Sequence, residues 1–533
     1  MNPTPPHERI CLLTGGGYPY RRDALGGWCR TLVEGLRRFR FELLTVTDRE
    51  QPSAPAYPLP LHVVSARAVA LGRDPNRADR RRGGSTPDGA DEAAALLCQG
   101  LLGDGQGPRA DTPGLPSGPG GRLSADTSGT ARFTEGLRRI TGLCPADGTE
   151  VDAEPLAALP LAEALLEAWR QHQAGDPDGR TTLPRLSVRD ARTAATLLRH
   201  ALRATAVPLP DVDLVHCVGG TTPLLAALGG RWRTGTPLLL TEARAAVIRQ
   251  RPAEERLSAG VRTVLRRFRA AVTRTGYAEA ALIAPLSAYH HGWALDHGAQ
   301  PARLVQVPAG VDPREYPGAA EPAETPTVVW AGSGGPGSGL SLVLEAFTEV
   351  TAALPATVLH LVGVTEAHEE HCAEQIERTG LGRAVRLHPL PADPRDRYTV
   401  GQVVAHVPGP ADPPYRLVEA MMSGRAVVGV DVGPAGETLG DTGILVPAGD
   451  PSELAIAITG LLRAPARRRA LGEAARRRAL DHFTVDRVTR SYGALYTDLA
   501  APPPAPAFEL ALTVPAPRTT TPATLRWLTR ETS

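Results

Sequence analysis

The sequence predicts an α/β protein of two Rossmann-like lobes, each with a mainly parallel sheet, that face a common cleft. Three observations support this fold class. The 533 residues exceed what one hydrophobic core sustains. Short aliphatic runs alternate with helical patterns, as in parallel sheets. The Pro/Glu/Ala-rich stretch 317–326 separates two such series, so we expect domains at 1–316 and 327–500.

The first lobe opens with an apolar strand from Ile10 to Leu13 and a glycine-rich turn at 15–17. Gly26 and Gly27 then precede a helix whose apolar residues recur at helical spacing. A strand, a glycine-rich turn and a helix begin an open α/β sheet, which binds ligands beyond the carboxyl ends of its strands. Further strands are expected at 41–46, 214–217, 237–241, 281–284 and 304–307, and helices within 156–206.

Two segments are expected to lack order. Residues 71–131 include runs such as 80–84 (RRRGG) and 116–121 (PSGPGG), which bury too little apolar surface to offset chain entropy. We therefore expect a largely disordered insertion in the first lobe. The Pro-rich tail 501–533 is expected to be disordered as well.

The second lobe shows the same alternation more regularly. Strands are expected at 328–331, 358–362, 385–387, 403–407, 426–430 and 444–446. A Ser/Gly-rich loop, 332–339, joins the first of them to a helix with an apolar stripe. Near the end, Asp450, Pro451 and Glu453 have the N-cap, N1 and N3 chemistry of a helix start.

Composition excludes several classes of partner and compartment. The 58 Lys and Arg residues against 57 Asp and Glu give a net charge of +1, so we expect no nucleic-acid partner. The six cysteines are scattered without a C-x-x-C pair, which favours a reducing compartment over a disulfide framework or a zinc site. No signal peptide and no run near 18 apolar residues is evident, so a cytoplasmic location is expected.

Two stretches carry a resemblance to a known family. Residues 415–428, YRLVEAMMSGRAVV, followed by the G-x-L-V-x-x-G-D of 443–450, resemble the P-x-x-L-L-E-A-M-A-C-G-x-P-V-V region of retaining glycosyltransferases of family 4. Residues 13–20, LTGGGYPY, with Gly27 and Trp28, resemble the subgroup of the Pel exopolysaccharide glycosyltransferase, as do 237–242 and 307–312. The resemblance implies the two-lobed GT-B fold and transfer of a hexose from a nucleotide-diphosphate sugar to a saccharide or small-molecule acceptor, with retention.

The resemblance also implies a donor site. Glu419 would hold the ribose, and Gly26 and Gly27 would let the backbone approach the diphosphate. Asp412 to Pro414 would border the sugar. No metal and no cofactor is implied, and no general base is expected because the leaving phosphate assists on the same face. The catalytic residue therefore stays unknown.

This sequence departs from the family at the groups that bind the donor. Ser333 and Ser338 stand where the family has its phosphate-binding Arg and Lys, Ala411 replaces the first motif Glu, and Ala243 replaces a subgroup His. Losing two charge-assisted hydrogen bonds would cost roughly 3–6 kcal/mol if nothing replaced them. Two hypotheses follow. In one, backbone N–H groups with Arg416, Arg425 or Arg244 bind the phosphates. In the other, the chain is a degenerate homologue acting as a binding or regulatory subunit.

Several other sequence motifs are more simply interpreted as structural. His368 to His371 reads H-E-E-H, which is more typical of a solvated helix face than of a metal site. Asp211 and Asp213 form a D-x-D that precedes a strand, and His216 is expected to be a core histidine. The Arg clusters 467–469 and 476–478 are expected to be solvated, and an association with a polysaccharide-synthesis membrane complex stays open.

Overall fold

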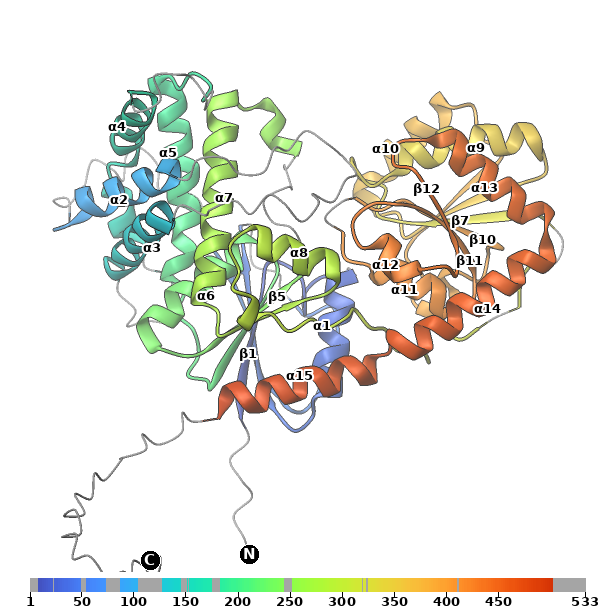
Figure 1. Ribbon diagram of the computed structural model, residues 1–533, viewed down its shortest axis with the longest axis horizontal. Helices are drawn as coiled ribbons and strands as arrows, with labels where there is room; N and C mark the ends of the chain where they lie inside the picture. The colour runs from blue at the N-terminus through green and yellow to red at the C-terminus, as the bar shows by residue number, and fades with distance from the viewer. Residues whose placement is uncertain are drawn as a thin grey trace, which may run out of the picture. The chain divides into compact units, whose positions relative to one another are not determined.

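The computed structural model describes residues 8–22, 24–48, 54–72, 87–103, 127–144, 151, 153–174, 183–243, 252–318, 320–322, 325–409 and 412–501. Two parallel six-stranded sheets organise the chain (Figure 1). The α/β prediction with two Rossmann-like lobes is therefore confirmed. No helix among the described residues is long and apolar enough to span a membrane.

The first sheet has the order β3-β2-β1-β4-β5-β6. Its strands are β1 (Arg9–Thr14), β2 (Arg40–Thr47), β3 (Val63–Ala70), β4 (Leu214–Val218), β5 (Leu238–Glu242) and β6 (Leu282–Pro285). β1 pairs with both β2 and β4, which places it at the centre. All of its residues after Arg9 are buried, as expected for a strand covered on both faces.

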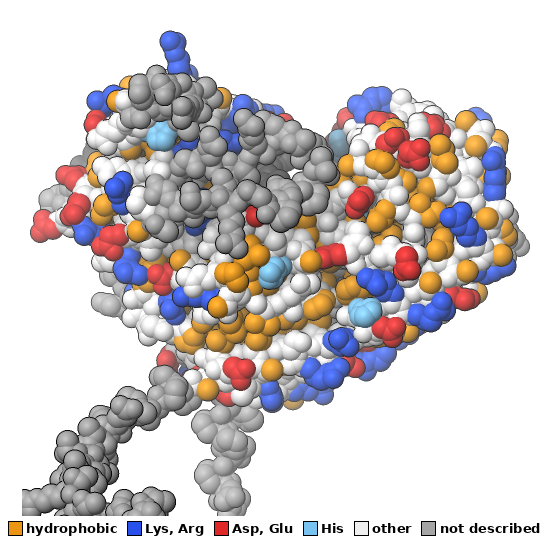
Figure 2. Space-filling model, viewed as in Figure 1, with side chains coloured by type: hydrophobic (Ala, Val, Ile, Leu, Met, Phe, Trp, Pro, Cys, Tyr) orange, Lys and Arg blue, Asp and Glu red, His pale blue; other side chains and the backbone are white. Residues whose placement is uncertain are grey.

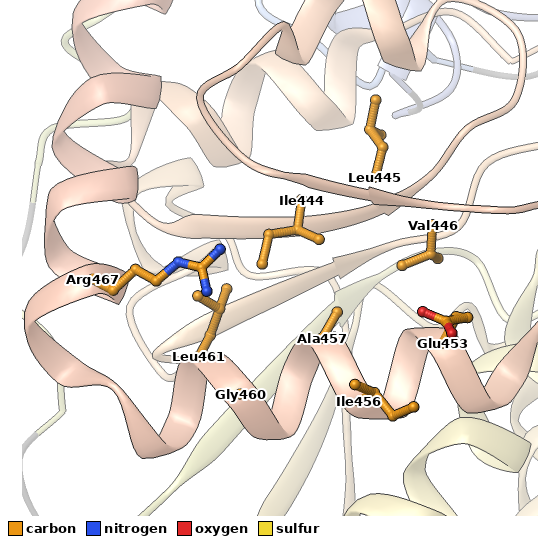
Figure 3. Close-up of a pocket in the computed structure, with 9 residues that line it drawn as sticks. All are labelled: Ile444, Leu445, Val446, Glu453, Ile456, Ala457, Gly460, Leu461 and Arg467. Atoms are coloured by element: carbon orange, nitrogen blue, oxygen red, sulfur yellow. The ribbon is translucent and has the colours of Figure 1, made fainter.

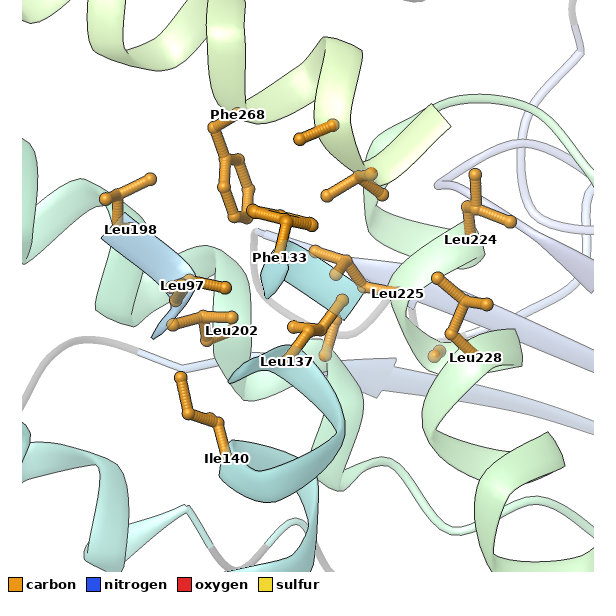
Figure 4. Packing of buried hydrophobic residues seen from close by; sticks show 14 of the residues in the cluster. Leu97, Phe133, Leu137, Ile140, Leu198, Leu202, Leu224, Leu225, Leu228 and Phe268 are labelled. Atoms are coloured by element: carbon orange, nitrogen blue, oxygen red, sulfur yellow. The ribbon is translucent and has the colours of Figure 1, made fainter. Parts of the chain in front are cut away.

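Helices cover both faces of this sheet. The ones typical of the fold are α1 (Ala24–Gly35), α6 (Thr221–Thr234), α7 (Ala259–Glu279) and α8 (Ala288–Asp296). A further layer consists of α2 (Ala90–Gly103), α3 (Thr127–Gly142), α4 (Leu161–Ala174) and α5 (Val188–Leu202). Figure 4 shows Leu97, Phe133 and Phe268 of this layer and of α7 packed into one buried cluster. The sheet core therefore continues into the helical layer.

The second sheet has the order β12-β11-β10-β7-β8-β9. Its strands are β7 (Thr327–Ala331), β8 (Val358–Val362), β9 (Val385–His388), β10 (Val403–His406), β11 (Ala426–Val430) and β12 (Ile444–Val446). The helices that follow the strands are α9 (Leu340–Ala353), α10 (Glu366–Arg378), α11 (Tyr415–Met422), α12 (Ala435–Leu439), α13 (Pro451–Arg463) and α14 (Pro465–His482). The N-cap prediction at α13 is confirmed, since the Asp450 side chain accepts from the Glu453 N–H at 3.0 Å.

The last helix, α15 (Val485–Ala500), returns to the first lobe. It packs against α1 and β4, and Figure 1 shows it running along that sheet. Tyr492 and Tyr496 are its buried anchors. The chain therefore crosses between the lobes twice, once at 313–326 and once just before α15.

The prediction of a largely disordered insertion is wrong in part. Residues 90–103 of the expected disordered stretch 71–131 form α2, and eight of its residues are buried. One glycine on each helix permits the close approach of α2 and α3: a Cβ at Gly100 of α2 would lie 2.3 Å from the Phe133 nitrogen, and one at Gly136 of α3 would lie 2.4 Å from the Leu97 nitrogen. Residues 73–86 and 104–126 lie outside the described residues, as does the tail from 502.

Two smaller predictions also need correction. The first helix begins at Ala24, so Gly26 and Gly27 lie in its first turn and not before it. The expected strand 304–307 runs beside β6, with the Val305 N–H donating to the Ile283 carbonyl at 2.9 Å. It forms only an isolated bridge there, through Leu304.

Candidate functional site

In both sheets the strand order reverses beside the first strand. The reversal lies between β1 and β4 in the first lobe and between β7 and β10 in the second. Helices leave a parallel sheet in opposite directions at such a point, so a crevice opens beyond the carboxyl ends of the two strands. The loops after β7 and β10 hold Ser333, Ser338, Asp412 and Pro414. The fold thus brings these predicted site residues to one edge of the second sheet.

Arg416 is a cation at this edge. It lies in the first turn of α11, and its Nη1 donates to the carbonyl of Ala331, the last residue of β7, at 3.2 Å. Burial and then the Arg416 charge lower the pKa of His406, the last residue of β10, to about 4. Arg416 therefore lies at the carboxyl ends of both strands of the switch point. A guanidinium has five N–H donors, and the bond to Ala331 uses one of them.

The Ser/Gly loop that follows β7 has a defined backbone. Gly334, Gly337 and Gly339 have φ of 79°, 75° and 81°, which favours glycine. At Gly339 a Cβ would also lie 2.5 Å from the Val407 carbonyl oxygen, so the loop after β10 closes on the start of α9. The N-terminus of α9 therefore lies beside the loop that follows β10, at the switch point. This helix end carries a partial positive charge.

The two loop serines are placed differently. The Ser333 carbonyl accepts from the Thr365 N–H at 3.2 Å and lies 3.1 Å from His368 Nδ1, which ties the loop to α10. The Ser338 hydroxyl oxygen is buried and has no hydrogen-bond partner among the described residues. Ser338 therefore lies just before the start of α9 with a buried hydroxyl.

The Asp412 carboxylate forms a hydrogen bond within the loop that follows β10. Asp412 Oδ2 accepts from the Gly409 N–H at 3.0 Å, and Asp412 N donates to the Gly409 carbonyl at 3.0 Å. Pro414 is the residue before α11. Ala411 lies outside the described residues. Asp412 is exposed, and its side chain stabilises its own turn.

Glu419 lies in the second turn of α11 and is 6% exposed. Its Oε2 pairs with Arg397 Nη1 and accepts from the Tyr398 hydroxyl at 3.2 Å. The Arg397 Nη1 also donates to the Tyr316 hydroxyl at 3.2 Å. Arg397, Tyr398 and Tyr316 do not belong to any sequence motif, because they precede β10 or lie in the interlobe segment, apart from the 415–428 motif along the chain.

Gly26 and Gly27 lie in the first turn of α1, which approaches the start of α11. The ring of Trp28, the next residue of α1, is 6.2 Å from the ring of Tyr415, the first residue of α11. A Cβ at Gly27 would meet no atom within 4 Å, so open space adjoins that backbone. The first turns of α1 and α11 therefore approach each other, and both carry the positive end of a helix dipole.

His216 is a core histidine, as the sequence analysis expected. Its Nδ1 is 2.7 Å from the Tyr496 hydroxyl and its Nε2 is 2.7 Å from the Thr241 hydroxyl. Burial lowers its pKa to about 3, so the imidazole is neutral near pH 7. Both ring nitrogens have partners that lock α15 onto β4 and β5.

The D-x-D motif at 211–213 has a structural role. Asp213 accepts from the Arg9 N–H at 2.7 Å, at the amino end of the first sheet. Within the described ranges no group of three or more His, Cys, Asp or Glu side chains is placed to hold a metal ion.

The two predicted Arg clusters lie on α14. Arg467, Arg469 and Arg477 are exposed, and Figure 2 shows basic side chains over this helix. Arg468 instead is buried and pairs with Glu321 at 2.8 Å.

A pocket of about 320 Å³ lies elsewhere in the second lobe. Figure 3 shows it between β12 and α13, with Ile444, Val446 and Ile456 as apolar lining and Arg467 and Glu453 at its two ends. None of the predicted site residues lines it. β12 is the edge strand farthest from β7, so this pocket is separate from the switch point.

Family models match both lobes. Residues 325–464 match the family described as glycosyl transferases group 1. Residues 8–100 and 178–302 match a domain of unknown function, DUF3492. The first match spans β7 to α13, which includes the Ser/Gly loop, Arg416 and Glu419.

Similar proteins support the same assignment. A D-inositol 3-phosphate glycosyltransferase of Kineococcus radiotolerans is 33% identical over 34% of this chain, and the match spans about half (49%) of that relative. Sucrose-phosphate synthase of Thermosynechococcus elongatus has a TM-score of 0.56 at 17% identity, covering 92% of this chain and 99% of its own. HepE of Anabaena, solved in complex with UDP and glucose, has a TM-score of 0.52 at 14% identity, covering 92% and 100%. This chain therefore has the GT-B fold of glycosyltransferases, and its C-terminal lobe carries a glycosyl transferases group 1 domain.

Proposed function

We propose that this protein transfers a hexose from a nucleoside-diphosphate sugar to a saccharide or small-molecule acceptor, with retention of the anomeric configuration. The observation that carries the proposal is the position of Arg416 at the carboxyl ends of β7 and β10. A cation at the switch point of a group 1 domain is suited to a diphosphate. HepE, which shares the fold, was solved with UDP and glucose, which supports a nucleotide-sugar donor.

Each part of the donor has a group that suits it. The diphosphate would meet Arg416, the Ser338 hydroxyl and the N-terminus of α9. The backbone of Gly26 and Gly27 would approach it from the first lobe. The ribose would lie on Glu419, and the sugar would lie beside 412–414. Arg416 would stabilise the negative charge that develops on the leaving diphosphate, which is the main demand of this reaction on the protein.

We further propose that the protein is a member of glycosyltransferase family 4, near the Pel exopolysaccharide subgroup. The support is the N-terminal motif 13–28, which leads from β1 into the first turn of α1. No metal and no cofactor has a role in this proposal. The anomeric configuration of the product, measured by NMR, tests retention: an inverted product contradicts it.

Arg416→Gln tests the role of the cation. It should weaken the binding of the nucleoside diphosphate about tenfold or more, since a hydrogen bond to a charged group contributes about 1.5–3 kcal/mol. Binding of the corresponding nucleoside, which has no phosphate, should not change. Calorimetry with both ligands measures the difference, and Arg469→Gln, on the exposed face of α14, is the matched control. Equal losses for the nucleoside and its diphosphate would contradict a phosphate-binding Arg416.

A second candidate is a catalytically degenerate homologue that acts as a binding or regulatory subunit. It is favoured by Ser333 and Ser338 in place of cations and by the engagement of Asp412 with its own loop. This candidate predicts that the fold is kept while nucleotide binding and donor hydrolysis are both absent. Mass spectrometry of proteins bound to the intact chain would then identify its partner.

A further inference from the structure

Three side chains hold the Glu419 carboxylate, because the Tyr316 hydroxyl hydrogen-bonds it in addition to Arg397 and Tyr398. Arg397 Nη1 and the Tyr398 hydroxyl both bond to the same oxygen, Oε2. An ionised carboxylate offers about four lone-pair sites on its two oxygens. The three bonds from Arg397, Tyr398 and Tyr316 therefore fix the orientation of the group and leave part of its acceptor capacity unused.

Arg397 is itself fixed by its surroundings. Its side chain is 16% exposed, and its guanidinium lies 5.9 Å from the centroid of the Tyr316 ring. Burial lowers the pKa of Arg397, but the Glu419 carboxylate and the two tyrosines raise it by more. The guanidinium therefore stays charged and immobile, as a group that orients another must be.

Stability alone is a poor reason for this arrangement. Desolvating two charges offsets most of their attraction, so a buried ion pair is often no better than apolar side chains of the same volume. A ribose presents two neighbouring hydroxyls, and a carboxylate oxygen in a fixed position accepts from both without first losing rotamer freedom. The fixed orientation of the Glu419 carboxylate suits such a task.

We propose that Arg397 is a positioning residue of the nucleotide site, which together with Tyr398 and Tyr316 orients the Glu419 carboxylate so that its remaining acceptor capacity meets the ribose hydroxyls. The inference rests on the proposed nucleotide-sugar function and deepens it. Arg397 acts through Glu419 and touches no reacting atom. Tyr316 supports Arg397 from the interlobe segment.

The test compares two ligands on matched variants. The ligands are the ribonucleoside diphosphate that the wild-type protein binds and its 2′,3′-dideoxy counterpart, and the measured quantity is the ratio of their Kd values. Wild-type protein should prefer the ribonucleotide by about tenfold or more. Arg397→Gln should bring that ratio close to one by weakening ribonucleotide binding alone, and Arg397→Lys should restore part of it.

The controls separate orientation from folding. Arg395 is exposed and lies in the same short turn, 394–397. Arg395→Gln should therefore leave the ratio of the two Kd values unchanged. Tyr398→Phe removes one bond to Oε2 and keeps the ring, so it should lower the ratio less than Arg397→Gln does. Tyr398→Phe also keeps the proposal testable if Arg397→Gln does not fold. Unfolding by denaturant is measured for each variant in parallel.

Three outcomes would overturn the inference. Equal weakening of both ligands in Arg397→Gln would show a purely structural ion pair. Tighter ribonucleotide binding would show that Arg397 competes with the ribose for Glu419. A wild-type protein that binds both ligands equally would leave Glu419 without a ribose role, although nucleotide binding would stand. Binding of neither ligand would instead refute the proposed function together with the inference.

Discussion

Glu419→Ala is expected to damage both nucleotide binding and the fold. The variant loses the acceptor for the ribose, which should weaken nucleotide binding by about tenfold to 100-fold, from about 1.5–3 kcal/mol. It also leaves Arg397 buried without its ion partner, which should lower the free energy of unfolding by about 3–5 kcal/mol. Calorimetry and urea unfolding measure the two losses separately.

Two further variants decide how the Glu419 result is interpreted. Glu419→Gln keeps the volume and one carbonyl acceptor, so it should lose less stability than Glu419→Ala while it still weakens nucleotide binding. Glu345→Ala, on the exposed face of α9, should change neither quantity. A Glu419→Ala protein with wild-type stability and affinity would remove Glu419 from both the ion pair and the site.

Phe133→Ala should destabilise the first lobe by about 3–5 kcal/mol, because it empties a large buried volume in the helical layer. Phe133 is fully buried and packs edge to face on Phe268 of α7, with the ring centroids 6.0 Å apart (Figure 4). The measurement is the midpoint and slope of urea unfolding.

The neighbouring variant Arg132→Ala is the control for the helical layer. Arg132 is exposed on the same helix, so its loss should stay within about 0.5 kcal/mol of zero. If Phe133→Ala were as mild as Arg132→Ala, α2 and α3 would not belong to the cooperative core of the lobe.

Most of the sheet elements could be predicted from the sequence because buried parallel strands are nearly continuous apolar runs. β4, β5, β10 and β11 are of this kind, and their burial is complete or nearly so. β3 was missed, since its sequence, VVSARAVA, carries polar residues suited to an edge strand with partly exposed positions. The helix at 90–103 could not be predicted because the neighbouring segments are rich in Gly and Pro, whereas Gly100 within α2 permits close helix packing.

The candidate site was predictable in part. The motif placed Arg416 and Glu419 on one helix, and the glycine-rich loop placed Ser338 at the start of another. The partners of Glu419 could not be inferred, because Arg397 and Tyr316 reach it through folding and not through spacing. Nor does spacing show that Asp412 is engaged with its own turn. Motifs identify helix positions, while tertiary contacts determine how a carboxylate is oriented.

The most direct test of the proposed function is calorimetry of the intact wild-type protein against UDP, GDP and ADP. The donor site described above predicts that one of the three binds with a micromolar Kd, about −8 kcal/mol. The same nucleotide should bind more weakly to Arg416→Gln and to Glu419→Gln. Absence of binding by all three nucleotides up to millimolar concentration would contradict the transferase and favour the degenerate homologue.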